Sequence, residues 1–179
     1  MPFKNQLKTI QLKDYPTIKA ILKKSDARSI VIDDAGYLIT DHFMEGHSKT
    51  GAGNAVFAFY NEIGDNFYKF IKFIIEEVDA DKIVYLLMHE EKNDFGDIKP
   101  KTIGKLLDEK VCLEGMFSIV LRCYGDSERH VFLTKSNGYD ITKTPIGLFA
   151  EPEIDNDLKA VDDAIREYYD IKVKTEESK

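Results

Sequence analysis

The sequence predicts an α/β fold with a mainly parallel sheet flanked by helices and a C-terminal β-hairpin. Two apolar runs, 29–32 and 83–88, have the unbroken composition of strands that are buried on both faces. Helical segments alternate with them, which is typical of βαβ units with right-handed crossovers. Two later apolar runs, 117–123 and 131–134, flank the turn residues Gly125-Asp126-Ser127 and predict an antiparallel hairpin.

The helices of the first half are predicted from apolar periodicity. Pro16 suits the first turn of a helix over 15–24. The segment 54–78 repeats large apolar residues at near-helical spacing, and Gly64 is the position where a break or bend is expected. The small and polar segment 46–53 predicts a mobile loop before this helix.

The second half adds two helices and a tail. A short helix is expected over 102–110, and another over 158–169 with Asp155 or Asn156 as its N-cap. The charged residues at the end predict a disordered tail over 171–179, after a single domain over 1–170. At 179 residues the chain is long enough to bury a core without disulfides or metals.

The composition of the chain bears on which cellular compartment and which binding partners are expected. The chain has 25 Lys and Arg against 32 Asp and Glu, which gives a net charge of −7 and no overall basic field for nucleic acid. DNA contact would therefore be local. Cys112 and Cys123 lack a CxxC spacing, which favours free thiols in a reducing compartment. No apolar run is long enough for a bilayer and no signal peptide is evident, so a cytoplasmic protein without membrane contact is expected.

Polar residues follow both predicted buried strands. Asp33 and Asp34 follow the first, and His89 follows the second. The carboxyl ends of parallel strands meet at one edge of a sheet, where α/β proteins bind ligands. An apolar strand that ends in two carboxylates matches the Walker B pattern, in which Asp33 would hold Mg²⁺ and Asp34 would polarise a water. His89 would hydrogen-bond a γ-phosphate or orient water. The alternative is that these residues have no functional role: Asp33 and Asp34 would then form a strand end and a turn, and His89 would be a structural or solvent-facing histidine.

A phosphate-binding loop is missing from the sequence. Gly46 and Gly51 bracket four residues, but Ala52 and Gly53 follow where a Walker A loop needs Lys and then Ser or Thr. A phosphate loop must also join a strand to a helix, so that its backbone N–H groups face the phosphate, and the segment is therefore interpreted as a flexible loop.

The residues alone are also compatible with two other kinds of site, a metal-dependent catalytic site and a basic contact surface. Acidic and histidine side chains suit a two-metal phosphoesterase, although no tight ligand motif such as HExxH is present. These candidates are Asp33, Asp34, Asp41, His42, His47, His89, Glu90 and Glu91. Basic side chains could contact nucleic acid or phosphate, with a solvated surface as the alternative. These are Lys99, Lys101, Lys105, Lys110, Lys135 and Lys143.

Several segments together resemble phage-encoded, RecA-like AAA-type P-loop ATP-binding proteins. The matching segments are Phe3-Lys4-Asn5 to Gln11, Ser29-Ile30-Val31-Ile32-Asp33-Asp34-Ala35, Lys101-Thr102-Ile103-Gly104-Lys105-Leu106-Leu107-Asp108-Glu109-Lys110 followed by Glu114-Gly115-Met116-Phe117, and Ile154-Asp155-Asn156-Asp157-Leu158-Lys159-Ala160-Val161-Asp162. The resemblance extends over nearly the whole chain, from about Phe3 to Tyr169.

The resemblance implies an ATP-binding, nucleotide-binding core that acts in phage DNA replication or recombination. It implies ATP and Mg²⁺ as cofactors, Walker B roles for Asp33 and Asp34, and a sensor role for His89. DNA, phage recombination or replication proteins and further copies of the chain are the implied partners. Because the first strand and the Walker A loop of the family are absent, the chain is expected to be a fragment, a split subunit or a degenerate relative. A non-catalytic interaction module is the alternative.

Overall fold

The computed structural model describes residues 10–11, 14–103, 107 and 110–171. Its helices are α1 (Tyr15–Lys24), α2 (Tyr37–Gly46), α3 (Asn54–Glu77) and α4 (Leu158–Tyr168), with short 3₁₀ turns η1 (His47–Lys49) and η3 (Glu114–Met116). Its strands are β1 (Ser29–Ile32), β2 (Ile83–Leu86), β3 (Glu90–Lys92), β4 (Ile98–Pro100), β5 (Arg122–Gly125), β6 (His130–Leu133) and β7 (Glu153–Asp155).

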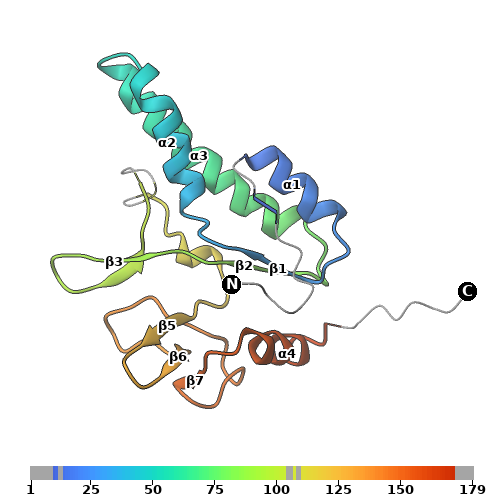
Figure 1. Cartoon of the computed structure of the whole chain (residues 1–179). Coiled ribbons are helices and arrows are strands. Elements are labelled where there is room, and N and C mark those ends of the chain that lie inside the picture. Colours follow the sequence, from blue (N-terminus) through green and yellow to red (C-terminus); the bar gives the residue numbers. More distant parts are fainter. Residues whose placement is uncertain (1–9, 12–13, 104–106, 108–109, 172–179) are drawn as a thin grey trace, which may run out of the picture.

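Strands β1 and β2 form a parallel pair at the centre of the molecule (Figure 1). Ser29 lies opposite Ile83, and Ile32 lies opposite Leu86. Because successive side chains of a strand point to opposite faces, Ile30 and Val84 contact one apolar core whereas Tyr85 contacts a second. β2 therefore contacts apolar cores on both faces. On β1 only the face of Ile30 and Ile32 does so, and Val31 on the other face is 46% exposed, so the prediction that this strand is buried on both faces is wrong.

Helices α1, α2 and α3 cover one face of this pair (Figure 1). α1 begins after Asp14, whose carboxylate accepts a hydrogen bond from the Thr17 amide at 2.8 Å. α3 is continuous through Gly64 and buries Phe67 and Phe70 completely. The bounds predicted for α1 are confirmed, whereas the break or bend expected at Gly64 does not interrupt α3.

The segment before α3 differs from the sequence prediction. α2 occupies Tyr37–Gly46 and continues into η1, so the predicted loop over 46–53 is shorter than expected. α2 packs along the first half of α3, and their connection points away from the rest of the molecule (Figure 1).

Helix α4 and the three-stranded sheet β5–β6–β7 cover the other face of the parallel pair (Figure 1). β5 and β6 form the predicted hairpin, with Arg122 opposite Leu133, and β7 adds antiparallel to β6. α4 buries Val161 and Ile165 against this sheet. Its N-cap is Asp157, one or two residues after the predicted caps.

The sheet organisation corrects the prediction of a mainly parallel sheet. The chain folds as a mixed α/β protein, but among the described strands the parallel pairing joins β1 to β2, and the other two sheets are antiparallel. The run 83–88 ends as a strand at Leu86, and Glu90–Lys92 turns back through Asn93 and Gly96 to pair with β4. Short strands joined by tight turns can only pair antiparallel.

Two predictions fall on residues outside this description. The helix expected over 102–110 includes 104–106 and 108–109, and the expected tail includes 172–179. Within the part of the chain that is described, no helix has the length and apolar content to cross a membrane.

Candidate functional site

The carboxyl ends of β1 and β2 lie side by side and form the candidate site. The parallel ladder continues past the strands, because the Leu87 amide donates to the Ile32 carbonyl at 3.0 Å and the Ala35 amide donates to the Leu87 carbonyl at 2.8 Å. These bonds hold Asp33 and Asp34 beside the residues that follow β2. Ligands of parallel sheets bind at this edge.

Asp34 and His89 meet at this edge. The Nε2 atom of His89 lies 3.1 Å from the Oδ1 atom of Asp34, and the two side chains are 70% and 53% exposed. Such an exposed pair contributes little to stability. Asp34 also has a φ angle of 51°, in the left-handed region that a non-glycine residue adopts only at a cost. The geometry leaves both groups accessible to a ligand.

Asp33 is exposed next to Asp34 and can supply carboxylate oxygen, the donor that Mg²⁺ prefers. Magnesium keeps several waters and is usually held by one or two protein carboxylates together with phosphate oxygens of the substrate. The residues present fit that arrangement. Among the described residues no three His, Cys, Asp or Glu side chains gather to hold a metal by themselves.

The alternative metal ligands do not collect at the strand end. His42 lies on α2, with its Nε2 atom 3.7 Å from the Oε1 atom of Glu62 on α3. His47 stacks on the Phe43 ring, with 4.9 Å between the ring centroids. The two-metal phosphoesterase interpretation therefore has no supporting cluster in the described part of the chain.

The chain returning from the β3–β4 hairpin passes close to His89. The Lys101 amide donates to the His89 carbonyl at 2.8 Å, and the Lys101 carbonyl oxygen lies 3.8 Å from where a Cβ on Gly36 would be. Gly36 precedes α2 directly. The edge of the parallel pair is thus bordered by the start of α2 and by the segment around Lys101.

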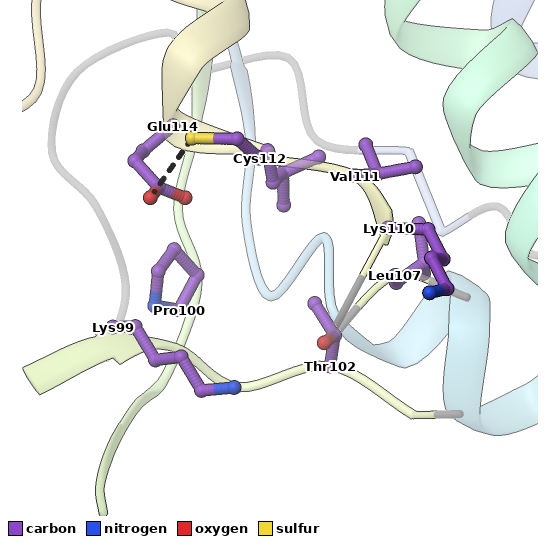
Figure 2. A pocket seen from close by; sticks show the side chains of 9 residues that line it. Lys99, Pro100, Thr102, Leu107, Lys110, Val111, Cys112 and Glu114 are labelled. Carbon is purple, nitrogen blue, oxygen red and sulfur yellow. Dashed lines mark hydrogen bonds between the residues drawn. The ribbon is translucent and has the colours of Figure 1, made fainter. Parts of the chain in front are cut away.

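A cavity of about 290 Å³ lies next along this segment (Figure 2). Lys99, Thr102 and Lys110 supply its hydrogen-bond donors, and Cys112 and Glu114 lie on its other side. The Cys112 thiol donates to the Glu114 carboxylate, with 3.2 Å between Sγ and Oε1. Lys99 and Lys110 are among the lysines that the sequence suggests as contacts to nucleic acid or phosphate, with a solvated surface as the alternative, but the sequence does not predict a cavity.

An ion pair fixes the strand that follows His89. The Arg122 guanidinium on β5 donates two hydrogen bonds to the Glu90 carboxylate, at 2.7 and 2.9 Å. These bonds hold the pKa of Glu90 below its usual value. The Asp140 side chain is only 1% exposed, with its Oδ2 atom 3.9 Å from Nη1 of Arg122. Arg122 therefore joins the β3–β4 hairpin to the antiparallel sheet beside the candidate site.

A second polar cluster joins α4 to the parallel pair, and no pattern in the sequence predicts it. Asp162 accepts hydrogen bonds from Ser29, Tyr85 and Arg166 at 2.8, 2.9 and 2.7 Å. Burial raises the pKa of Asp162, but these hydrogen bonds outweigh it, so the pKa lies below its usual value. Arg166 also donates to the Arg28 carbonyl at 2.8 Å. This cluster is structural, because its side chains bond to one another and to the Arg28 carbonyl in the interface between α4 and the parallel pair.

Comparison of the chain with protein-family models, with curated proteins and with solved structures found no significant match.

Proposed function

We propose that the carboxyl ends of β1 and β2 bind Mg-ATP, with the roles of a Walker B strand. Asp33 holds the magnesium ion through its carboxylate, Asp34 polarises a water, and His89 hydrogen-bonds the γ-phosphate or that water. The observation that carries the proposal is the parallel pairing that places Asp34 and His89 3.1 Å apart at the ligand-binding edge. The resemblance of the segment 29–35 to RecA-like AAA-type P-loop proteins supports the same roles.

A complete site of this kind also needs a phosphate loop, and the sequence does not contain one. No Gly-Lys followed by Ser or Thr occurs in the chain. That loop supplies most of the hydrogen bonds and the lysine charge that bind the phosphates of ATP. In this proposal the strand end alone therefore binds Mg-ATP weakly, and a further segment or polypeptide is needed to complete an ATPase core.

The biological setting of the proposal rests on the resemblance alone. A phage-type protein of this kind acts in the host cytoplasm on DNA, in replication or recombination, together with other phage proteins. The net charge of −7 restricts DNA contact to local basic groups such as Lys99 and Lys110.

Paramagnetic broadening tests where the nucleotide binds. Mn²⁺ replaces Mg²⁺ in nucleotide complexes and broadens the NMR signals of nearby nuclei. Titration of the ¹⁵N-labelled chain with Mn-ATP is expected to broaden the amide signals of Asp34, Ala35 and His89 first. Broadening confined to other segments would show that the ion binds elsewhere.

A non-catalytic interaction module is the second candidate, and the end of the α2–α3 hairpin favours it. Phe57 is 72% exposed there, and Met44 and Val56 are exposed as well. Exposed apolar groups gathered on a projecting element mark protein-binding surfaces. A second copy of the chain is the simplest occupant, because two identical hairpins can pack about a two-fold axis.

Sedimentation analysis of the wild type and of Phe57→Ser tests this candidate. The wild type is expected to self-associate as its concentration rises, and Phe57→Ser is expected to stay monomeric. Lys69→Ser, on the second half of α3, is the matched control. A wild type that is monomeric at every concentration would reject a second copy as the occupant.

A further inference from the structure

The cavity in Figure 2 has a charge distribution suited to an anion. Lys99, from β4, and Lys110 place two ammonium groups on its wall, and Glu114 places one carboxylate there. Thr102 adds a hydroxyl group at the edge that Lys99 also borders (Figure 2). The wall carries a net positive charge in a protein whose total charge is −7.

The two ammonium groups are available to a ligand. Lys99 lies 3.4 Å from Glu91, but both side chains are 36% exposed, and such ion pairs contribute little. Lys110 is exposed, and no ion pair of its ammonium group occurs within the described residues. The Glu114 carboxylate accepts the Cys112 thiol hydrogen, and its single negative charge is outnumbered by the two ammonium groups.

The remaining wall is apolar. Pro100, Val111 and Leu113 line it, and Leu113 is buried in the core that also covers β1 and β2. A cavity of about 290 Å³ has room for a phosphate group and part of an attached organic group. Binding sites for small ligands usually combine such apolar walls with a few polar groups that fix orientation.

We infer that this cavity binds the phosphate group of an organic phosphate through Lys99, Lys110 and Thr102. A phosphate dianion matches two ammonium groups in charge and offers oxygen acceptors for both lysines and for the hydroxyl group. The inference goes beyond the proposed function, because it needs neither magnesium nor Asp33. Lys101 lies in the chain between the cavity residues Pro100 and Thr102, and its amide donates to the His89 carbonyl, so a backbone hydrogen bond links the cavity wall to the β1–β2 edge.

NMR titrations in EDTA, without magnesium, test the inference. Pyrophosphate and Mg-free ATP are the two probes, and both are expected to shift the amide signals of Lys99 and Thr102. Lys99→Gln with Lys110→Gln is expected to weaken binding about tenfold, the loss typical of charge-assisted hydrogen bonds. Lys110→Gln alone, an exposed change that leaves the fold intact, is expected to weaken it to a smaller extent.

The controls separate this inference from the proposed function. Lys69→Gln removes a lysine on α3 and is expected to leave binding unchanged. Asp33→Asn removes the proposed magnesium ligand and is expected to leave Mg-free binding unchanged. Stronger binding of ATP than of pyrophosphate identifies an organic phosphate as the ligand. Binding of pyrophosphate alone would overturn the assignment of an organic ligand. Absence of binding, or equal binding by the double variant, would overturn the whole inference.

Discussion

Asp162 links the last helix to the central strands through one carboxylate. Its hydrogen bonds reach Ser29 at the start of β1, Tyr85 on β2 and Arg166 one turn along α4. The side chains of Asp162 and Arg166 are each 13% exposed, so water cannot easily replace these contacts. Asp163, the next residue, pairs with Lys159 at the surface, where both side chains are exposed.

Removing the Asp162 carboxylate is therefore expected to destabilise the protein. Asp162→Ala leaves the Tyr85 hydroxyl without its acceptor and removes the carboxylate partner of Arg166, so it should lower the free energy of unfolding by about 2 kcal/mol. Asp163→Ala removes only an exposed helical pair and should lower it by about 0.3 kcal/mol. Urea denaturation at pH 7 measures both. Equal losses in the two variants would show that the Asp162 cluster is not specifically stabilising.

The Asp162 carboxylate also makes the free energy of unfolding depend on pH. The folded-state pKa of Asp162 is lowered, so the folded protein binds this proton less readily than the unfolded chain. Its stabilising contribution is present above the unfolded pKa of about 3.9 and is lost as the pH falls through the folded pKa. The difference in unfolding free energy between the wild type and Asp162→Asn is expected to shrink between pH 6 and pH 3. A constant difference over this range would contradict the assignment.

At the scale of elements, helices with strong end signals were predictable. α1 has an aspartate cap, a proline in its first turn and lysines in its last turn, and its predicted bounds agree with the structure. α2 begins after Gly36 without a side-chain cap and has no acidic residue in its first turn and no basic residue in its last. Its packing on α3 stabilises it instead, and such tertiary contacts are not visible in a single sequence.

The start of α4 gives a test at this scale. Asp157 accepts hydrogen bonds from the Lys159 and Ala160 amides at 2.9 and 3.1 Å, whereas the sequence favoured Asp155 or Asn156 as the cap. Asp157→Ala is expected to lower the free energy of unfolding by about 1 kcal/mol. Asn156→Ala, the matched control, is expected to change it much less. A larger loss in Asn156→Ala would place the cap one residue earlier.

At the scale of the whole molecule, the central parallel pair was predictable and the remaining sheet structure was only partly so. The runs 30–32 and 83–88 are apolar apart from the Tyr85 hydroxyl group, because Ile30 and Ile32 of β1 contact one apolar core and the residues of β2 contact two. The sequence also predicted the β5–β6 hairpin, but not β7, because its Glu-Ile-Asp alternation covers only three residues and is too short to indicate a strand. Pairing of short strands depends on distant partners, which the local pattern does not encode.

The candidate site likewise combines features that the local sequence predicts with features that depend on residues distant in the chain. The placement of Asp34 and His89 at neighbouring strand ends followed from the sequence, because parallel strands share one carboxyl edge. The cavity beside them was not predictable, because Lys99 and Lys110 come together only through the path of the chain after β4. Arg122 and Glu90 are likewise distant in sequence and paired in the structure.

The central claim is that the carboxyl ends of β1 and β2 form a Mg-ATP site, and calorimetric titration with Mg-ATP tests it most directly. The wild type is expected to bind, and Asp33→Asn is expected to bind about tenfold more weakly because an ionised ligand is lost. Asp26→Asn changes an exposed aspartate before β1, at the opposite end of the strand, and should bind like the wild type. Absence of binding by the wild type, or equal binding by all three proteins, would contradict the claim.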